Sequence, residues 1–335
     1  MTQSNTTLLC ARFEIEKQIR RFLWSKNFTE VRTPLLVKCP GMEPHIRPIE
    51  VSNPHSTRKT FLPTSPEFGM KKLIGAGMTN IFQLCPSFRD EPQSVEHHPE
   101  FTLLEFYESN TSLEMFQTLV EQLIQHLIRQ QTADSSPFHY QGKRIYWQDP
   151  WPRFRIPDLF EEHLGIDLRE HQDSSTLAHV CKKVGISASA KEPWDDLYFK
   201  LWLNCIEPKL SENRFSFVTH YPTRQSSLCN TLQDEKGFTW AKRFELYLGH
   251  LELGNAFDEL LDPKIQLENF KHDQDVRKAI YGDSYPESPL DDDLLAALPK
   301  MPPTCGIAIG VDRLCMILLD LPTIDSVLPL KSYWG

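Results

Sequence analysis

The sequence predicts an α+β fold in which helices flank an antiparallel sheet. Predicted strands gather in two parts of the chain, near residues 80–107 and 214–260, and do not alternate regularly with helices. Regular alternation would favour a parallel, doubly wound sheet, whereas clustered strands favour an antiparallel one. The sequence also lacks both common phosphate-binding glycine loops, GxxxxGK(S/T) and GxGxxG. Any nucleotide site in this chain therefore needs another kind of motif.

The individual elements follow from hydrophobic periodicity. In chain order, the first half predicts an amphipathic helix at 8–27, a strand at 28–34 that ends at Pro34, a turn and helix at 63–75, strands at 80–90 and 98–107 joined by a polar loop, and a helix at 113–128 behind a Ser112 cap. The second half predicts loops and short amphipathic pieces at 132–195, a helix near 194–206, strands between 214 and 260, a charged helix and loop at 261–290, and a strand with a buried helix around 306–314.

The composition sets limits on partners and compartment. The chain has 335 residues, of which 40% are hydrophobic and 24% charged, as is ordinary for a globular protein. A net charge of −9 does not favour a protein that grips long nucleic acid, because phosphate contacts need clustered Lys and Arg. The eight cysteines form no CxxC pair, which indicates reduced thiols and neither a zinc site nor a disulfide framework. Without a signal peptide or an apolar run of about 20 residues, we expect a cytoplasmic protein.

Two separated segments carry the strongest chemical signal. The first is 88–91 (FRDE), followed after a short loop by 97–105 (HHPEFTLLE), and the second is 306–314 (GIAIGVDRL). Each supplies an arginine, Arg89 and Arg313, and a highly charged triphosphate needs arginine at both of its ends. Taken alone, an arginine such as Arg89 is more often a surface salt-bridge partner. The second segment also fits a buried strand that turns into a core helix.

A pair of glutamates gives a further signal. Glu252 and Glu259 lie seven residues apart in the otherwise apolar segment LELGNAFDE. Buried carboxylates without partners are costly. A divalent cation that bridges ATP phosphates would satisfy both, so we expect Glu252 and Glu259 to ligate a metal, or one of them to bind a substrate amine. The ordinary alternative is a pair of glutamates on a solvated face.

The two arginine segments, in this order and at this separation, resemble motifs 2 and 3 of the class II aminoacyl-tRNA synthetases. Pro34 stands where those enzymes carry the motif 1 proline of their dimer interface. The segments TSPEFGMKKLIGAG, FRDE, HHPEF and LELGNAFDELLDP are similar to the lysyl-tRNA synthetases in particular. The resemblance implies a class II synthetase-like antiparallel sheet and an ATP-dependent ligase that forms AMP and pyrophosphate. It also implies ATP and Mg²⁺ as cofactors.

The resemblance assigns roles to single residues. Arg89 would grip the α-phosphate and the amino acid carboxylate, and Arg313 would meet the γ-phosphate, so both are the expected catalytic residues. Glycines at 306 and 310 would let the backbone approach the nucleotide closely. The residues expected to bind ATP are Arg89, Asp90, Glu91, His98, Phe101, Glu252, Leu253, Gly310 and Arg313. The residues expected to bind the amino acid are Ser65, Pro66, Glu67, Tyr107, Asn255, Glu259 and Ala308.

Two features narrow the resemblance further. The sequence begins just before motif 1, which leaves no room for the N-terminal anticodon-binding barrel of a lysyl-tRNA synthetase, and Ala308 stands where those enzymes typically have glycine. Both features resemble the EpmA (PoxA, GenX) family of elongation factor P–(R)-β-lysine ligases. That resemblance implies a single class II synthetase-like catalytic domain over residues 1–335. It further implies (R)-β-lysine as the activated amino acid, elongation factor P as the acceptor, a homodimer, and neither tRNA nor a membrane as partner.

Some positions depart from the family pattern. His98 and Asp90 stand where asparagine is usual, and the loop at 92–96 lacks a basic residue and contains Glu96. Two alternatives stay open: a minimal lysyl-tRNA synthetase that uses α-lysine and tRNA, and a catalytically silent paralogue with a regulatory role. The histidines have no metal-ligand spacing, so a transition-metal enzyme has little support.

Overall fold

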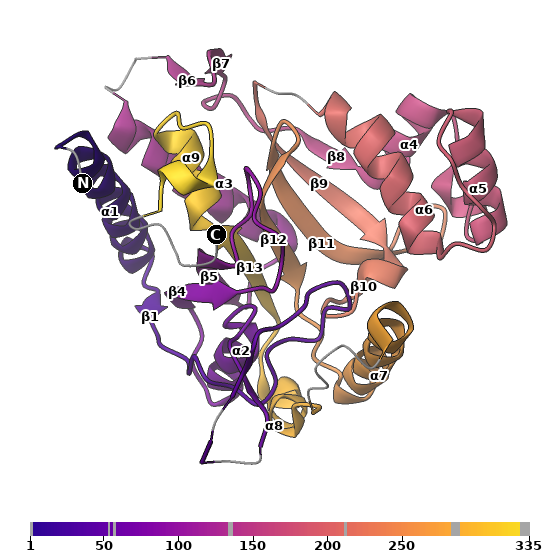
Figure 1. The fold of residues 1–335 in the computed structure, drawn as a ribbon, viewed down its shortest axis with the longest axis horizontal. Coiled ribbons are helices and arrows are strands. Elements are labelled where there is room, and N and C mark those ends of the chain that lie inside the picture. The colour runs from indigo at the N-terminus through magenta and orange to yellow at the C-terminus, as the bar shows by residue number, and fades with distance from the viewer. Residues whose placement is uncertain are drawn as a thin grey trace. The chain divides into compact units, whose positions relative to one another are not determined.

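The computed structural model describes residues 3–52, 54–55, 58–132, 137–210, 213–282 and 289–328, and it confirms the α+β class. The chain forms two compact units. Unit 1 comprises Met1–Arg144, Ser227–Asn230 and Ala256–Gly335, and unit 2 comprises Ile145–Ser226 and Thr231–Asn255. Figure 1 traces the elements in chain order. The expected single catalytic domain over residues 1–335 stays a prediction, and the two units are described separately.

Unit 1 contains the strands of both arginine segments. Its main strands are β1 (Thr29–Glu30), β4 (Ile81–Phe88), β5 (Glu100–Ser109) and β13 (Thr304–Gly310), adjacent in that order. β4 and β13 both pair antiparallel with β5, as expected. β1 pairs parallel with β4, which differs from the purely antiparallel sheet that we expected. A parallel pair requires a long crossover, and the chain between these two strands includes helix α2.

Strand β5 brings the two arginine segments together. The hairpin register sets Phe88 of β4 opposite Glu100, immediately before Arg89 leaves the strand. On the other side of β5, Ala308 of β13 lies opposite Glu105. Residues more than 200 positions apart in the sequence therefore flank the same strand (Figure 1).

The helices of unit 1 follow the predicted periodicity. In the helix predicted at 113–128, Phe116, Val120 and Leu123 are fully buried, and the Ser112 hydroxyl accepts a hydrogen bond from the Met115 N–H at 3.3 Å. The remaining elements of unit 1 are α1 (Gln3–Ser25), α2 (Glu67–Gly75), α3 (Leu113–Gln131), α7 (Pro263–Tyr281), α8 (Asp292–Ala297), α9 (Val311–Leu318), the single turns η6 (Leu298–Lys300) and η7 (Ile324–Ser326), and the strand pairs β2 (Glu50–Val51) with β3 (Thr60–Phe61) and β6 (Phe138–Tyr140) with β7 (Lys143–Ile145).

Unit 2 contains the region that the sequence left least defined. Its strands are β8 (Arg153–Arg155), β9 (Phe215–Pro222), β10 (Thr231–Gln233), β11 (Thr239–Leu248) and the first part of β12 (Leu251–Asp258), whose last three residues belong to unit 1. β11 pairs antiparallel with β9 and β10, and β8 pairs parallel with β9. Its helices are α4 (Ile156–Leu164), α5 (Ser174–Lys183) and α6 (Trp194–Leu201), with short turns η1 (Leu168–Glu170), η2 (Trp202–Ile206), η3 (Glu207–Lys209) and η4 (Thr223–Gln225). The helix predicted near 194–206 is thus confirmed as α6 followed by a π turn.

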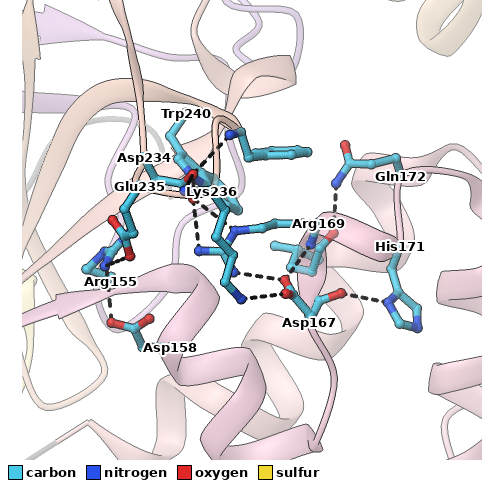
Figure 2. Close-up of polar contacts among 12 residues, drawn as sticks. Arg155, Asp158, Asp167, Arg169, His171, Gln172, Asp234, Glu235, Lys236 and Trp240 are labelled. Atoms are coloured by element: carbon cyan, nitrogen blue, oxygen red, sulfur yellow. Dashed lines mark hydrogen bonds and ion pairs between the residues drawn. The ribbon is translucent and has the colours of Figure 1, made fainter.

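One ionic group holds the turn between β10 and β11, with a buried carboxylate at Asp234 and an exposed cation at Lys236, and we call it the Asp234 cluster (Figure 2). It consists of Asp167, Arg169, Asp234, Lys236 and Trp240. The Asp234 carboxylate accepts hydrogen bonds from Arg169 Nε at 2.9 Å and Trp240 Nε1 at 2.8 Å, besides two backbone N–H groups of the turn. Asp167 in turn accepts from Arg169 at 3.0 Å and contacts Lys236 Nζ at 3.3 Å. Two carboxylates therefore meet two cations.

The pKa of Asp234 reflects this complete set of donors. Burial by itself raises the pKa of the carboxyl, but the hydrogen bond from Trp240, the turn N–H groups and Arg169 outweigh it and hold the pKa well below its usual range. The charged form of Asp234 is therefore the one that the fold stabilises.

Candidate active site

Arg89 lies at the mouth of the β4–β5 hairpin. Its backbone N–H donates to the Pro99 carbonyl at 2.9 Å, which closes the hairpin, and its guanidinium lies over the Phe101 ring at 5.0 Å from the centroid. The buried Nε of Arg89 has no hydrogen-bond partner among the described residues. The hairpin therefore holds the arginine in place while leaving a donor for an anionic ligand.

Arg313 lies in the first turn of α9 and contacts the hairpin loop. Its Nε donates to the Glu96 carbonyl at 3.2 Å, and its Nη2 lies 2.8 Å from Nε2 of His97. Burial, and then the charge of Arg313, lower the pKa of His97, so a neutral ring accepts this hydrogen bond. The loop is also anchored to η7, because the Ile324 N–H donates to the Val95 carbonyl at 2.9 Å. The structure thus joins the two arginine segments through this loop.

Asp312, the neighbour of Arg313, is fixed by buried contacts. It is 1% exposed, and one carboxylate oxygen accepts from the Thr102 N–H at 2.6 Å. The other forms an ion pair with Arg12 of α1, which also donates to the Thr102 hydroxyl at 2.9 Å and to the Val327 carbonyl at 3.0 Å. Helix α1, strand β5 and helix α9 are therefore tied together directly beside Arg313.

Three further residues expected at the nucleotide have mixed surroundings. Asp90 is exposed and pairs with Arg47, whose Nε lies 2.9 Å from its carboxylate. His98 is 5% exposed, and its Nδ1 lies 2.7 Å from the Glu100 carbonyl oxygen. The Glu91 N–H donates to the Arg89 carbonyl at 2.9 Å. The backbone of the hairpin loop thus holds His98 and Glu91 near Arg89, whereas Asp90 has an ion pair of its own.

The second part of the candidate site is a group of buried charges that we call the Lys71 cluster. It consists of Glu67, Lys71, Glu105, Tyr107 and Glu259. Glu67 and Lys71 lie one turn apart on α2, and Lys71 Nζ is 2.5 Å from both Glu67 Oε1 and Glu259 Oε2. On β5, the Tyr107 hydroxyl donates to Glu105 Oε1 at 2.5 Å. The four residues besides Glu67 are at most 2% exposed.

This cluster holds three carboxylates and one ammonium, so its charges do not balance. Burial raises the pKa of Glu105 and of Glu259 to about 8, and for Glu105 the charge of Glu67 adds to the effect. Lys71 stays charged, because its carboxylate neighbours raise its pKa despite burial. Glu259 faces that ammonium directly, whereas Glu105 Oε2 is buried without a hydrogen-bond partner among the described residues. We therefore assign the retained proton to Glu105.

Strand β13 forms one wall of the Lys71 cluster. A Cβ atom on Gly306 would lie 2.3 Å from Tyr107 Cε1 and 2.6 Å from Glu259 Oε1, so only glycine fits there. We expected Gly306 to admit the nucleotide, but the structure places it against the buried carboxylates instead. Ala308 lies opposite Glu105. A Cβ atom on Gly310 would have nothing nearer than Arg313 at 3.9 Å, so that glycine leaves open space beside the arginine.

Ser65 and Pro66 position Glu67 at the start of α2. Pro66 is the N-cap residue, and the Ser65 hydroxyl accepts from the Glu67 N–H at 3.0 Å. Both residues also line a cavity of about 330 Å³ together with Pro34 and Leu36. This cavity includes none of the charged residues of the Lys71 cluster, so we do not identify it with the chemical site.

Glu252 and Glu259, the two expected metal ligands, do not both fit that role. Glu259 Oε2 is already 2.5 Å from an ammonium, which disfavours a divalent cation at the same oxygen. Among the described residues, no group of three or more His, Cys, Asp or Glu side chains could hold a metal ion. Glu252 and Asn255 lie in the part of β12 that belongs to unit 2, as does the buried Leu253. Their contacts with ATP, metal or amino acid stay predictions.

Comparison with known proteins decides the family. The family model described as tRNA synthetases class II (D, K and N) matches residues 1–331. This chain belongs to that class II synthetase family. An elongation factor P–(R)-β-lysine ligase of Klebsiella pneumoniae (strain 342) is 34% identical over 96% of the chain and 93% of that protein. One of Salmonella paratyphi B is 33% identical with the same coverage, and a lysine–tRNA ligase of Coxiella burnetii (strain RSA 493) is 32% identical over 98% of the chain and 64% of that protein.

The candidate site contains residues that the sequence did not single out. Glu105 was hidden as one carboxylate in an apolar strand, and only the pairing of β5 with β13 shows that it lies in the site. Lys71 follows Glu67 at a spacing that also suits an ordinary surface ion pair on a helix. His97, for which the sequence showed no metal-ligand spacing, is an exposed histidine that is hydrogen-bonded to Arg313. No helix in the described part of the chain is long and apolar enough to cross a membrane.

Proposed function

We propose that this chain activates (R)-β-lysine with ATP and transfers the β-lysyl group to a lysine ε-amine of elongation factor P. The observation that carries the proposal is the Lys71 cluster, which buries three carboxylates with one ammonium, and that ammonium pairs with two of them, Glu67 and Glu259. Two negative charges are left to be balanced, and β-lysine brings two ammonium groups. A pocket for a neutral or acidic amino acid would not have this composition.

The distance between the two parts of the site suits such a substrate. Strand β5 carries Phe101 beneath Arg89 and Glu105 within the cluster. Four residues of strand span roughly 13 Å, which the reaching side chains and an extended lysine-sized molecule can bridge. The carboxylate end of the substrate would then meet Arg89 while its ammonium groups meet the cluster.

The first step is the formation of the adenylate. An oxygen of the substrate carboxylate attacks the α-phosphorus of ATP, and the bond from that phosphorus to the bridging oxygen breaks to release pyrophosphate. Arg89 neutralises the charge that builds on the α-phosphate, and Arg313 holds the departing phosphates. No general base is required, because the carboxylate is itself the nucleophile. The rate gain comes from positioning and charge stabilisation.

The second step is transfer to the acceptor protein. The neutral ε-amine of the acceptor lysine attacks the carbonyl carbon of the adenylate, AMP leaves with the bond electrons, and the nitrogen loses a proton. Binding of ATP would further use Glu91, His98, Phe101 and Gly310. ATP brings Mg²⁺ with it.

The names of the relatives support this choice of acceptor. The ligases of Klebsiella and Salmonella that are named for elongation factor P match this chain over 93% of their own length. We further propose a cytoplasmic homodimer that forms through the motif 1 segment around Pro34. The molar mass in solution, measured for the wild-type protein and for Pro34→Ala, tests whether a homodimer forms through this segment.

A second candidate function is the charging of tRNA with α-lysine. It is favoured by the lysine–tRNA ligase of Coxiella burnetii, which is 32% identical over 98% of this chain. The net charge of −9 weighs against it, since tRNA binding draws on clustered basic residues. Formation of lysyl-tRNA by the purified protein would move the assignment to this candidate.

The decisive experiment is amino-acid-dependent exchange of pyrophosphate into ATP, with (R)-β-lysine and α-lysine side by side. We expect strong exchange with β-lysine, followed by acylation of elongation factor P in a coupled assay. Arg89→Ala should abolish the exchange and leave the unfolding temperature unchanged. Exchange with α-lysine alone would favour the tRNA ligase, and no exchange from folded protein would favour a regulatory paralogue.

A further inference from the structure

Lys71 occupies the position where an amine of the substrate would be expected. Its Nζ lies between Glu67 and Glu259, 2.5 Å from an oxygen of each, and the residue is 1% exposed. The next lysine on α2, Lys72, points to a different partner and pairs with Asp291 at 2.6 Å. The Lys71 cluster therefore contains a built-in ammonium that belongs to the protein.

This ammonium determines how much charge the pocket offers to a ligand. With Lys71 in place, two of the three carboxylates share one cation, whereas Glu105 has hydroxyl groups, those of Tyr107 and Ser65, as its hydrogen-bonding neighbours. A buried carboxyl group with no cation beside it has its lowest free energy in the protonated form. The free pocket is therefore expected to keep a proton on Glu105 until a cationic ligand replaces it.

We propose that Lys71 is a positioning residue that fixes the pocket to accept an amino acid with two ammonium groups, and that such a ligand expels one proton from the cluster as it binds. The inference rests on the proposed function, because it deepens the role of the same site. Lys71 aligns Glu67 and Glu259 from between them, and it prevents these two carboxylates from taking up protons of their own.

The other charged groups around Glu105 support the assignment of the retained proton to Glu105. Burial, and then the charges of Glu67 and Glu259, together raise the pKa of Glu105 to about 8 against the hydrogen bonds from Tyr107 and Ser65. Two carboxylates outside the cluster, Glu43 and Asp258, add further negative charge around it. The titratable groups that face the cluster are Glu67, Lys71, Tyr107 and Glu259 within it, and Glu43, Cys85 and Asp258 around it.

Removing the ammonium has a consequence that a purely structural lysine would not have. Without Lys71, Glu67 and Glu259 lose their shared cation and take up a further proton in the free protein. A ligand with two ammonium groups must then expel more protons than before. A lysine that only filled space would change the affinity but not the number of protons released.

The test is calorimetric titration of the full-length protein with (R)-β-lysine near pH 7, in buffers of different protonation enthalpy. We expect the wild-type protein to release roughly one proton per ligand and Lys71→Met to release about two. Lys71→Arg keeps the charge and should match the wild type, and Glu105→Gln should release none. Lys72→Met is the matched control, because it removes a neighbouring lysine on the same helix outside the cluster, and its proton count should equal that of the wild type.

Each outcome separates this inference from the proposed function. A proton count that Lys71→Met leaves unchanged, or a wild-type count of zero, would overturn the inference while leaving the enzyme assignment intact. If folded wild-type protein binds neither (R)-β-lysine nor α-lysine, the proposed function is wrong and the inference is wrong with it. If Lys71→Met does not fold, the Lys71→Arg and Glu105→Gln titrations decide. The analogue of β-lysine that lacks the terminal amine should bind without releasing a proton.

Discussion

The Lys71 cluster of unit 1 and the Asp234 cluster of unit 2 each contain buried carboxylates, but they differ in charge balance. The Asp234 cluster sets two carboxylates against two cations, and turn N–H groups and an indole satisfy the remaining acceptors. The Lys71 cluster sets three carboxylates against one cation. The pKa of Asp234 is accordingly lowered, whereas the pKa values of Glu105 and Glu259 are raised to about 8.

The direction of the pKa shift therefore separates two uses of buried charge. A carboxylate whose pKa is lowered by complete hydrogen bonding stabilises the fold when it is charged. A carboxylate whose pKa is raised by burial is destabilising when charged, and it is retained where a ligand supplies the missing cation. We expect variants of the first cluster to change stability and variants of the second to change binding.

The largest effect is expected from Asp234→Ala. Removing this carboxylate leaves the buried Arg169 with fewer partners and takes the acceptor away from Trp240, so we expect a loss of about 3–5 kcal/mol in the free energy of unfolding. Chemical denaturation of the variant measures it. Glu235→Ala is the control, because Glu235 is 69% exposed and pairs with Arg155 at 3.3 Å, so that solvent screens the pair and its loss should change stability far less. Equal losses from both variants would contradict the distinction between the clusters.

Glu259→Gln should act on binding. The substitution removes a charge that is proposed to face an ammonium of the substrate, so we expect the KM for the amino acid to rise about 100-fold. Stability should change much less, because the carboxylate is part of an unbalanced cluster. Exchange kinetics and thermal unfolding measure the two effects. Asp258→Asn is the neighbouring control, since Asp258 already accepts a hydrogen bond from Asn230 at 2.6 Å. Unchanged KM in folded Glu259→Gln would remove Glu259 from the site.

Glu105→Gln should alter the pH dependence of stability. A carboxyl whose folded pKa is raised to about 8 contributes most stability below its unfolded pKa, and that contribution is lost as the pH rises towards 8. Glutamine does not ionise, so we expect the variant to gain about 1–3 kcal/mol over the wild type at pH 8 and much less at pH 5. Unfolding curves across this range measure the gain. A difference that is the same at every pH would show that Glu105 does not titrate there.

The smallest effect is expected from Ala308→Gly. Ala308 lies opposite Glu105 on the neighbouring strand, and we propose that its methyl group lies at the amino acid site. We expect its removal to shift the preference towards α-lysine by roughly tenfold, the scale of one methyl group in a pocket. The ratio of kcat/KM for α-lysine and (R)-β-lysine in the exchange assay measures it. An unchanged ratio would show that this methyl does not select the substrate.

The elements that the sequence predicts best are those with local signals. Helix α3 follows from apolar residues at helical spacing behind Ser112, and the β4–β5 hairpin follows from two strand patterns around a polar loop. The individual elements within residues 132–195 could not be predicted from the sequence, because the helices there are short and β8 has only three residues. The parallel pairing of β8 with β9 depends on residues far apart in sequence, which periodicity does not report.

The candidate site shows the same limit. Arg89 and Arg313 are recognisable from motifs, and the structure joins them through Glu96 and His97. Lys71 and Glu105 could not be recognised as site residues from the sequence, because their roles depend on residues that lie beside them in the fold but far away in the chain. Glu105 lies opposite residue 308 only through strand register, and Lys71 meets Glu259 across almost 190 residues of sequence.

The ion pair between Arg12 and Asp312 has a consequence for the newborn chain on the ribosome. The two residues are 300 positions apart, so the arginine emerges long before the carboxylate that neutralises it. At about 5–20 residues per second, that interval is roughly 15–60 s. Throughout it, helix α1 lacks the contact that anchors it next to Arg313. The anchor beside the arginine expected at the γ-phosphate therefore forms only after Asp312 has been synthesised, and a product terminated before Asp312 would lack it altogether.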